Sequence, residues 1–420
     1  MNGMPKENTD SNFDVIIIGG GLAGASLACT LSGINKETSP PFKIAVVEAH
    51  VQTTDSHPSY DDRTVAISYG SRNIFDSMGL WSSLASHAES IDTIHISDRG
   101  HFGVTRLTKE QEGVEALGYV LENKRLGQHL YQAIDNSPFI TLFCPAELVS
   151  LQQDKNQVSI DMMIDGKKQQ LKGQLLVAAD GNNSQVKRLL NIGSSQKTYQ
   201  QTALITNVTP GKKHHHVAYE RFTDSGPLAF LPMQGNRCSV VWTLSPERAE
   251  SLKVLDETAF LAQLQERFGF RLGQFKRVGS RQIYPLSLQS ATQMVQGRVV
   301  IIGNAAHSVH PVAGQGFNLA LRDISLLSEM VADAYRARAD IGQSAMLQRY
   351  ALLREDDVKR VYRFTDTLVK MFSNAIAPLA HFRSLSLLMV DLVPDIKHQL
   401  ANQSMGLSGR LTRLARGLRL

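Results

Sequence analysis

Three glycines near the N-terminus have the spacing of a phosphate-binding turn. Gly19 and Gly21 lie between a short apolar run, residues 14–18, and a helix-forming stretch, residues 22–31. Gly24 lies at the start of that stretch. In such a turn the first glycine permits a sharp bend, the second lets a pyrophosphate approach the backbone, and the third lets helix and strand pack closely. The positive end of the helix dipole then faces the phosphates, so the pattern predicts dinucleotide binding.

An acidic residue stands where the ribose of such a dinucleotide would be bound. Glu48 lies near the end of the next apolar run, residues 43–49, and its carboxylate would accept hydrogen bonds from the ribose hydroxyls. An acid at this place favours an unphosphorylated ribose, as in NAD or in the AMP half of FAD. The glycine motif alone leaves these two cofactors open.

Two later stretches indicate a flavin. In each, an apolar run ends in a polar residue with a glycine, at Asp180-Gly181 and at Gly303-Asn304. The second stretch leads into a loop that ends at Gly314, where we expect a helix to begin. Backbone N–H groups at that helix N-terminus could hold the electron-rich ring edge of a flavin, which carries negative charge when the flavin is reduced.

These residues carry a family resemblance that covers residues 13–394. The chain resembles the single-component FAD-dependent aromatic monooxygenases, the fold group of para-hydroxybenzoate hydroxylase, and within it the hydroxylases of ubiquinone biosynthesis. The family signature HPxxGQGxNxGxxD is matched at His310, Pro311, Gly314, Gln315, Gly316, Asn318 and Asp323. The stretches 97–103, 220–233 and 237–242 are most similar to the 2-octaprenyl-6-methoxyphenol hydroxylase branch.

The resemblance implies a role for each residue that matches a family motif. The residues implied to hold the AMP half of FAD are Gly19, Gly21, Gly24 and Glu48. Arg63 resembles an arginine that helps to hold the flavin in its mobile positions, and Asp180 and Gly181 would contact the pyrophosphate and the groove that NAD(P)H visits. The residues implied to hold the ribitol and the isoalloxazine are Asn304, Gly314, Gln315, Gly316 and Asn318. No catalytic side chain is implied; Pro311, Gly314 and Gln315 belong to the loop that faces the flavin.

Three positions depart from the family pattern. Asn304 stands where most of the family has an aspartate, which keeps the hydrogen-bonding capacity and removes a charge. Ala320 replaces the last glycine of the signature, a conservative change inside a predicted helix. Asn123 stands where many relatives carry an arginine or a glutamine near the flavin, so no contact is carried over to it.

The resemblance also implies a reaction. NAD(P)H, as a transient co-substrate, would reduce non-covalently bound FAD, and O2 would then form a flavin C4a-hydroperoxide that hydroxylates a polyprenylated phenol. The expected step converts 2-octaprenyl-6-methoxyphenol to the 1,4-benzoquinol. The chain has one dinucleotide fingerprint, so we expect no separate nicotinamide domain. Three alternatives stay open: another ring hydroxylation of the same pathway, a flavoprotein scaffold of a lipid-biosynthesis complex with FAD mainly structural, and a flavin-dependent prenyl reductase.

The elements that must position these residues form an α/β fold. Apolar runs at 14–18, 43–49, 175–180 and 298–303 predict buried parallel strands of a Rossmann-type sheet. Alternating segments between residues 202 and 285 predict a mixed, largely antiparallel sheet, and residues beyond 314 predict helices. Because the strands of the first sheet are far apart in sequence, we expect a substrate domain inserted into an FAD-binding domain.

Domain and element bounds follow from these patterns. The expected FAD-binding domain comprises 12–90, 123–195 and 291–335, the substrate domain 91–122 and 196–290, the C-terminal helices 336–400, and a basic tail 401–420. Helices are predicted at 66–84, 123–133 and 257–268, with helix breaks near Pro378 and Pro394. The dipeptide Asp165-Gly166 predicts a hairpin turn.

Composition limits the class of protein. The chain has 420 residues, a net charge of +5 and only three cysteines, widely spaced, which excludes a disulfide framework and a CxxC metal site. No run of eighteen apolar residues predicts a spanning helix, and the polar N-terminus has no signal core. We therefore expect a cytoplasmic enzyme, and the modest charge does not indicate nucleic acid.

Two histidine groups could suggest a metal ion. His307 and His310 are three residues apart but lack a third ligand at matching spacing. The run Lys-Lys-His-His-His at residues 212–216 is more typical of a solvated loop between strands. We predict no metal site.

The C-terminal fifteen residues predict a basic amphipathic helix. Four leucines recur at spacings of four, three and four, and four arginines recur every third residue, at Leu407, Leu411, Leu414, Leu418, Arg410, Arg413, Arg416 and Arg419. Such a helix lies on anionic membranes, so we predict contact with the inner membrane surface, beside other ubiquinone-biosynthesis proteins. The alternative is a tail that packs on the enzyme or docks onto a partner, and three glycines weaken the helix.

Overall fold

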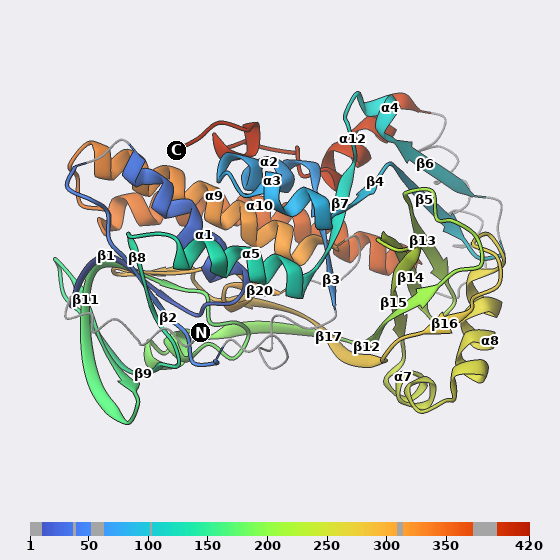
Figure 1. The fold of residues 1–420 in the computed structure, drawn as a ribbon, viewed down its shortest axis with the longest axis horizontal. Coiled ribbons are helices and arrows are strands. Elements are labelled where there is room, and N and C mark those ends of the chain that lie inside the picture. Colours follow the sequence, from blue (N-terminus) through green and yellow to red (C-terminus); the bar gives the residue numbers. More distant parts are fainter. Residues whose placement is uncertain (1–10, 37–38, 52–62, 101–102, 309–313, 373–392) are drawn as a thin grey trace.

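Two large β-sheets lie side by side along the molecule. The computed structural model describes residues 11–36, 39–51, 63–100, 103–308, 314–372 and 393–420. In Figure 1 the first sheet lies at the left and the second at the right, and the long strands β12 (Ser194–Thr209) and β17 (Gln282–Ala291) run between them.

The first sheet contains the predicted parallel strands. Its main path runs in the order β18-β19-β11-β1-β2-β8, and β10 and β9 extend it from β11. Its strands are β1 (Asn12–Ile18), β2 (Ile44–Val47), β8 (Ile140–Phe143), β9 (Glu147–Gln153), β10 (Val158–Ile164), β11 (Lys167–Ala178), β18 (Val295–Gln296) and β19 (Val299–Ile301). The four predicted strands β2, β1, β11 and β19 are neighbours and run parallel, which confirms the Rossmann-type arrangement.

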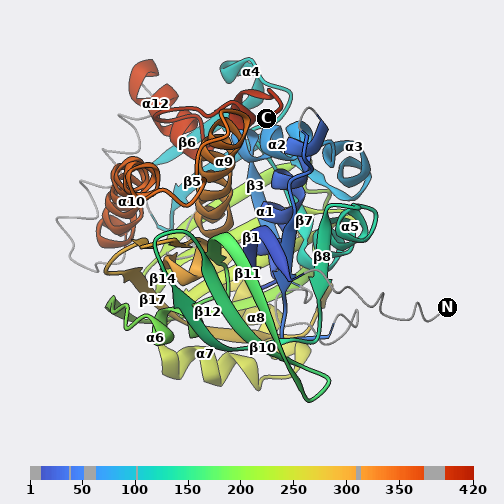
Figure 2. The same cartoon turned by 90° about the vertical axis from the view of Figure 1, so that its left-hand side faces the viewer.

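Both faces of this sheet are covered, which explains why its strands are apolar throughout. Val15 and Ile17 of β1 pack into the core formed with the helices of one face, whereas Ile16 and Ile18 pack against residues of β9, β10 and α6 on the other. The helices are α1 (Leu22–Ser32), α5 (Asn123–Asp135), α6 (Gln185–Leu189), α9 (Gln315–Arg336) and α10 (Ser344–Phe372). Figure 2 shows α1, α9 and α10 above the strands.

Strand β11 is part of both the hairpin and the buried parallel strand, which the sequence suggests are two separate elements. The expected hairpin turn is present, with positive φ at Asp165 (49°) and Gly166 (73°). The strand that follows, β11, pairs antiparallel with β10 through its first half and parallel with β1 along most of its length. The hairpin and the buried parallel strand are therefore one continuous element.

The second sheet is mixed and largely antiparallel, as predicted. Its path runs β20-β17-β12-β15-β14-β13-β5-β6, with β16 beside β12, and β13 and β5 are its parallel pair. The further strands are β5 (Thr93–Asp98), β6 (Val104–Thr108), β13 (Val217–Thr223), β14 (Gly226–Met233), β15 (Arg237–Leu244), β16 (Arg277–Val278) and β20 (His307–Ser308). Helices α7 (Pro246–Lys253) and α8 (Glu257–Phe268) pack on one face, around Phe230, Trp242 and Phe260.

The predicted helix at 66–84 is wrong in its first part. Thr64 to Ser68 form β3, which pairs antiparallel with β7 (Gly118–Glu122) in a three-stranded sheet with β4 (Glu89–Ile91). The helix α2 (Tyr69–Ser77) begins after the strand because the Ser68 hydroxyl accepts the Ser71 N–H at 3.3 Å. The remaining short helices are α3 (Trp81–Leu84), α4 (Lys109–Glu112), η1 (Gly33–Lys36), η2 (Ala85–His87) and η3 (Gly303–Ala305).

The predicted amphipathic tail helix is also wrong. After α12 (Pro394–Ser404), which begins at the expected Pro394 break, the chain forms only the short turn η5 (Leu414–Arg416). Gly406, Gly409 and Gly417 all have positive φ, which interrupts a helix. The side chains of the tail pack on the enzyme instead: Leu414 is 1% exposed.

Pro378 lies outside the described residues, and the division into domain segments remains a prediction, with β12 crossing the boundary expected at residue 195. Among the described helices, none has the length and apolarity needed to cross a membrane.

Candidate active site

A cavity of about 1320 Å³ lies between the two sheets. Part of its wall is the carboxyl edge of the first sheet, where Ile18, Val47 and Ala179 end or follow strands β1, β2 and β11. Ligands of doubly wound sheets bind at this edge. Because pockets for a single small ligand measure roughly 300–1,000 Å³, the cavity has room for a cofactor together with a substrate.

The glycine turn has the close packing that the sequence predicts. A Cβ atom on Gly19, whose φ is +99°, would lie 2.6 Å from the Ala179 carbonyl oxygen. A Cβ atom on Gly24 would lie 1.9 Å from the Gly19 carbonyl oxygen. Gly21 lines the cavity and is the N-cap of α1. Because glycine has no side chain, the N-cap residue makes no side-chain hydrogen bond to the first-turn N–H groups of this helix.

Glu48 lies beside this turn at the end of β2. Its carboxylate accepts the Gly20 N–H and, at 2.8 Å, the His50 N–H, and the residue is 5% exposed. These bonds fix the carboxylate on the cavity wall next to Gly21. The structure thus brings together the residues predicted to hold the AMP half of FAD.

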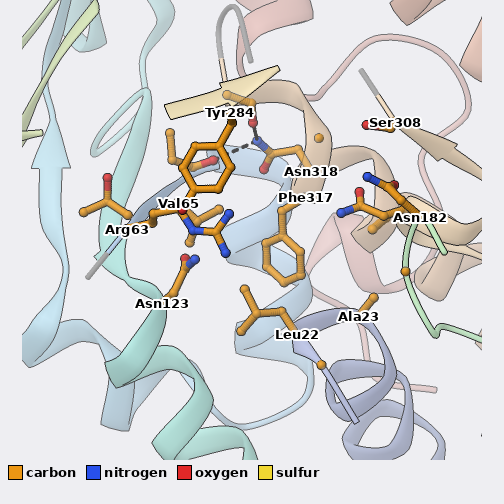
Figure 3. Close-up of a pocket in the computed structure, with 18 of the residues that line it drawn as sticks. Leu22, Ala23, Arg63, Val65, Asn123, Asn182, Tyr284, Ser308, Phe317 and Asn318 are labelled. Atoms are coloured by element: carbon orange, nitrogen blue, oxygen red, sulfur yellow. Dashed lines mark hydrogen bonds between the residues drawn. The ribbon is translucent and has the colours of Figure 1, made fainter. Parts of the chain in front are cut away.

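Arg63 lines the cavity, and the flavin contact that the resemblance implies for it stays a prediction. Its guanidinium carbon lies 5.0 Å from the centroid of the Tyr284 ring, a residue of β17. The Arg63 carbonyl accepts the N–H of Asn123, the first residue of α5, at 2.9 Å. Figure 3 shows Arg63, Tyr284, Asn123 and Phe317 around the same space.

Asp180 has one carboxylate oxygen bound and one unsatisfied. Its Oδ2 accepts the N–H groups of Gln185 (2.7 Å) and Val186 (3.2 Å) at the start of α6. Its Oδ1 is inaccessible to solvent and has no partner among the described residues, and burial raises the pKa of the carboxyl above its usual value. Asp180 and Gly181 both line the cavity, where a hydrogen-bond donor on a ligand would satisfy this oxygen.

The loop between η3 and α9 forms another part of the wall. Asn304 is exposed to the cavity from η3. Gly314, the N-cap of α9, has φ +62°, and a Cβ there would lie 2.9 Å from the Ala66 Cβ, so glycine fits both the backbone and the space. Gly316 lines the cavity, and Gln315 is 2% exposed. Pro311 lies outside the described residues.

Asn318 uses its amide within the protein. The Nδ2 group donates to the carbonyls of Ala66 (2.8 Å) and Gly314 (2.7 Å), and Oδ1 accepts the Ser68 N–H at 2.9 Å. Both N–H bonds of the amide are therefore taken, and the side chain holds α9 against β3. The part of Asn318 that lines the cavity can contact a cofactor, but we assign it a positioning role.

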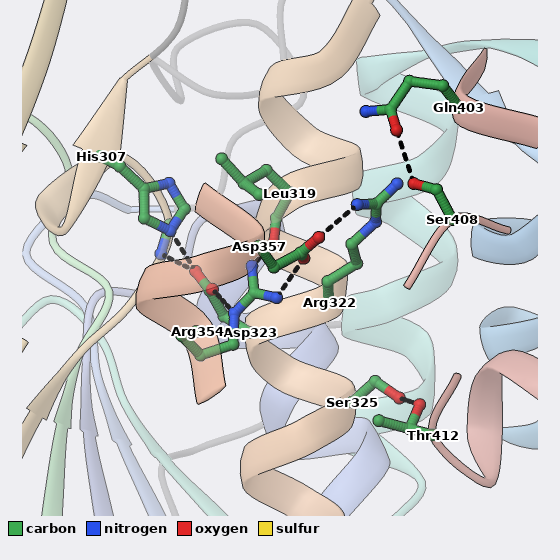
Figure 4. Close-up of polar contacts among 11 residues, drawn as sticks. His307, Leu319, Arg322, Asp323, Ser325, Arg354, Asp357, Gln403, Ser408 and Thr412 are labelled. Atoms are coloured by element: carbon green, nitrogen blue, oxygen red, sulfur yellow. Dashed lines mark hydrogen bonds and ion pairs between the residues drawn. The ribbon is translucent and has the colours of Figure 1, made fainter. Parts of the chain in front are cut away.

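The last residue of the signature, Asp323, is the centre of a buried ionic network. Its carboxylate is fully buried and lies 2.7 Å from His307 Nε2 and 2.7 Å from Arg354 Nε, and it accepts the Gly303 N–H at 3.0 Å. Burial alone would raise the pKa of Asp323, but His307 and Arg354 outweigh it and hold the pKa below its usual value. Figure 4 shows His307, Asp323 and Arg354 joined in this network, which links β20, α9 and α10.

The far half of the cavity is apolar. Residues two positions apart on β5, β12, β13, β14 and β15 face it, because side chains alternate across a strand. The apolar members of this wall are Ile94, Ile96, Ala203, Ile205, Ala218, Phe222, Ala229, Leu231 and Val241. Leu400 and Ser404 of α12 contribute from the C-terminal region.

One histidine cluster lies apart from this cavity lining. Glu89, His214 and His216 have potential ligand atoms within 4.8 Å of one another. Both ring nitrogens of His214 are engaged, since Nδ1 accepts the His216 N–H at 3.1 Å and Nε2 lies 3.1 Å from the Met233 carbonyl oxygen. Residues 212–216 do connect two strands, but His214 is buried at 7% exposure rather than solvated as expected.

The family model described as "FAD binding domain" matches residues 12–365 of the chain. The chain belongs to this FAD-binding family. It is 36% identical to ubiquinone hydroxylase UbiL of Rhodospirillum rubrum over 98% of the chain and 95% of the relative. It is 29% identical to 3-demethoxyubiquinol 3-hydroxylase of Escherichia coli over 95% of the chain and 100% of the relative.

Solved structures of other proteins share the fold. The p-nitrophenol 4-monooxygenase PnpA of Pseudomonas putida has a TM-score of 0.78 at 17% identity, covering 95% of this chain and 99% of that one. PqsL of Pseudomonas aeruginosa has a TM-score of 0.73 at 20% identity, covering 90% and 100%. The protein is therefore an FAD-dependent monooxygenase with the fold expected from its sequence.

The residues present fit FAD. Side chains on Gly19 and Gly24 would clash with backbone atoms, so these glycines allow the tight turn that carries the N-terminus of α1, and this uncapped N-terminus suits a pyrophosphate. Oδ1 of Asp180 and Oδ1 of Asn123 are inaccessible to solvent and lack a hydrogen-bond partner within the described part of the chain, so both could accept from donors on the cofactor. The fit of these two oxygens to a cofactor does not depend on the glycine motif.

Sequence reasoning missed three residues of this cavity: Asn123, Tyr284 and Glu220. Asn123 was set aside because it departs from the family pattern. Tyr284 and Glu220 lie on strands, and the alternation of β13 contained the necessary signal, because Ala218, Glu220 and Phe222 all face the cavity.

Proposed function

We propose that this monooxygenase hydroxylates the aromatic ring of a polyprenylated phenol in ubiquinone biosynthesis, and that its substrate is 2-octaprenyl-6-methoxyphenol, which becomes the 1,4-benzoquinol. The observation that carries the proposal is the division of one cavity into a polar flavin half and an apolar half walled by five strands. Phenols with a long isoprenoid tail match an apolar wall of this extent.

The relatives support the pathway and leave the step open. One is named a ubiquinone hydroxylase and another a 3-demethoxyubiquinol 3-hydroxylase. Human COQ6, a ubiquinone biosynthesis monooxygenase, is 28% identical over 94% of this chain and 92% of its own length. The alternative proposal is accordingly a different ring hydroxylation of the same pathway.

The chain's own residues bind, orient and exclude water. When bound, FAD reduced by NAD(P)H activates O2 and supplies the oxygen atom. Gly19, Gly21 and Glu48 would bind its AMP half, and Asp180 and Asn304 would hold the linker to the ring. Phe317 and the apolar strands would keep water from the reacting ring, which prevents loss of reducing equivalents.

The test is turnover by the purified, FAD-loaded protein. We expect oxidation of NADH or NADPH that depends on 2-octaprenyl-6-methoxyphenol, and a product that carries one atom from isotopically labelled O2 by mass spectrometry. A parallel reaction uses 3-demethoxyubiquinol, and faster turnover there would favour the alternative step. If neither phenol causes the FAD-loaded protein to oxidise the nicotinamide, the proposal is contradicted and a scaffold role is favoured.

A further inference from the structure

Glu220 lies on the apolar wall of the cavity. In β13, Ala218, Glu220 and Phe222 line the cavity, and Tyr219, which also borders it, packs its ring at 5.4 Å against Phe268 of α8. Across the sheet, Glu220 pairs with Ile96 of β5 and Ala229 of β14, and both also line the cavity. A carboxyl group therefore stands among apolar neighbours on every side within its sheet.

This carboxyl group has an unsatisfied oxygen. Its Oε1 is inaccessible to solvent and has no hydrogen-bond partner among the described residues. Burial raises the pKa of Glu220 from 4.5 to about 7, and no charged neighbour contributes to the shift. Tyr219 of the same strand is the ionisable neighbour on this wall. The other ionisable side chains on the cavity wall belong to different elements, and they are His50, Glu48, Arg63, Glu147, Asp180, Arg188 and Tyr284.

Glu220 as a whole is half-buried, but an inaccessible carboxylate oxygen without a partner among the described residues is costly, so its retention calls for a ligand that pairs with it. The neighbouring wall is mainly aliphatic, alanine and phenylalanine side chains, which suit a prenyl chain and a ring. The Ser239 hydroxyl on β15 already accepts a hydrogen bond from the Thr64 hydroxyl at 2.8 Å. Glu220 is the carboxylate that β13 presents there. A carboxyl that titrates near neutrality can hold a phenolic proton and release it again.

We propose that Glu220 is the residue that accepts the hydrogen bond and the proton of the phenol hydroxyl of the bound substrate. The inference rests on the proposed function and adds a catalytic residue to it. In the step, the phenolic O–H bond breaks and a new O–H bond forms on the Glu220 carboxylate, so one proton moves and no electron is lost. The resulting phenolate donates electron density into its ring, which makes the ring a stronger nucleophile toward the oxygen that the flavin supplies.

The test compares Glu220→Gln with a matched surface control. Glutamine keeps the size of the side chain and cannot take the proton. Glu266→Gln removes an exposed carboxylate of the same sheet domain, where Glu266 pairs with Arg99 at 3.3 Å and its side chain is 62% exposed. Bound FAD and the circular-dichroism spectrum, measured for both variants, show that each folds and carries cofactor.

Three readouts separate a proton acceptor from a merely structural residue. We expect kcat/KM of Glu220→Gln to fall by roughly 100-fold, within the range of general base catalysis. We expect wild-type kcat/KM to rise as pH increases through about 7, the pKa of Glu220, and the variant to lack this rise. A ring-fluorinated, more acidic phenol should restore most of the variant's activity, because that substrate ionises without help.

The outcomes distinguish this inference from the function on which it rests. If wild-type protein hydroxylates the phenol and Glu220→Gln matches it in rate and pH profile, the inference is wrong and the function stands. An equal loss with the parent and the fluorinated phenol would also overturn it. If wild-type protein hydroxylates no phenol, the test is the binding of a short prenyl-methoxyphenol compared with its methyl ether. If wild-type protein binds the free phenol more tightly than the ether and Glu220→Gln does not, the inference is supported. If wild-type protein binds both compounds equally, the inference is overturned.

Discussion

The guanidinium of Arg63 stacks on the ring of Tyr284, with 5.0 Å between the guanidinium carbon and the ring centroid. Arg63 immediately precedes β3, and Tyr284 belongs to β17 of the second sheet, so the contact bridges two sides of the cavity. We infer that Tyr284 sets where the Arg63 charge lies relative to the flavin, and that this ring is a positioning residue.

Tyr284→Ala should weaken FAD binding while Tyr284→Phe should not. A cation–π contact contributes roughly 0.5–2 kcal/mol, so its loss corresponds to a change of about two- to thirtyfold in the dissociation constant. Phenylalanine keeps the aromatic face and loses only the hydroxyl, which bonds to Gln282. Fluorescence titration of apoprotein with FAD measures both variants, and equal affinities for Ala and Phe would contradict the assignment.

Two glycines of the same turn should respond differently to a side chain. Gly21 has φ −62°, which any residue adopts, so Gly21→Val should fold and lose bound FAD, because the side chain blocks the approach of the pyrophosphate. Gly24→Ala places a Cβ 1.9 Å from the Gly19 carbonyl, so this smaller change should disrupt folding as well. Flavin absorbance and circular dichroism separate the two effects. Normal flavin content in Gly21→Val would show that the pyrophosphate lies elsewhere.

The strands around this turn could be predicted from the sequence because burial on both faces leaves a continuous apolar run, as in β1. The turn itself could be predicted because its glycines are required by backbone contacts. The alternation of β13 places Glu220 on one face with Ala218 and Phe222, but only the pairing of β13 with β5 and β14 shows that this face lines the cavity. Asn123 could not be placed from the family pattern, from which it departs, and the Oδ1 that lacks a partner among the described residues is a feature of the fold alone.

The Asp323 network should dominate the stability of the α9–α10 region. Asp323→Asn leaves His307 and Arg354 without their buried partner, and breaking a buried pair costs about 3–5 kcal/mol. The exposed pair of Asp333 with Arg413 is the control, and Asp333→Asn should cost no more than about 1 kcal/mol. Denaturant unfolding of the holoprotein gives both values.

The difference in stability between wild type and Asp323→Asn should depend on pH in one direction. The pKa of Asp323 is lowered in the folded protein, so its stabilisation is present above the ordinary value of 3.8 and is lost as pH falls through the folded pKa. The stability gap between wild type and Asp323→Asn should therefore shrink in acid. A gap that is constant down to the acid transition would mean that Asp323 is not ionised in the fold.

For Glu220 we expect the opposite dependence of stability on pH. Its pKa is raised from 4.5 to about 7, so the folded state is favoured relative to the unfolded state below pH 4.5, and this contribution is lost as pH rises through about 7. Relative to wild type, Glu220→Gln should gain melting temperature at pH 8 and much less at pH 5. Calorimetry at both pH values, with Glu266→Gln as control, checks this; a pH-independent difference would place the carboxyl in contact with water.

The C-terminal tail gives the last prediction. The leucine spacing that suggested a membrane-facing helix is equally compatible with a tail bound to the enzyme, because spacing alone does not say what the leucines contact. The structure places Leu414 in the main core at 1% exposure, beside Thr412, which bonds to Ser325. Arg413, one of the four arginines, binds Asp333 at 2.6 Å instead of a lipid headgroup.

Leu414→Ala should therefore destabilise the protein, and Leu418→Ala should not. Truncation of a buried leucine costs about 2–5 kcal/mol, whereas Leu418 is 50% exposed and its loss should change the free energy of unfolding by less than about 0.5 kcal/mol. Membrane contact remains a prediction for the exposed Arg416, Leu418 and Arg419. Co-sedimentation with anionic vesicles, compared between full-length protein and a version ending at Ser404, tests it at low and high salt. If Leu414→Ala unfolds at the same denaturant concentration as Leu418→Ala, the tail is not docked on the core, and its leucines are available to a membrane after all.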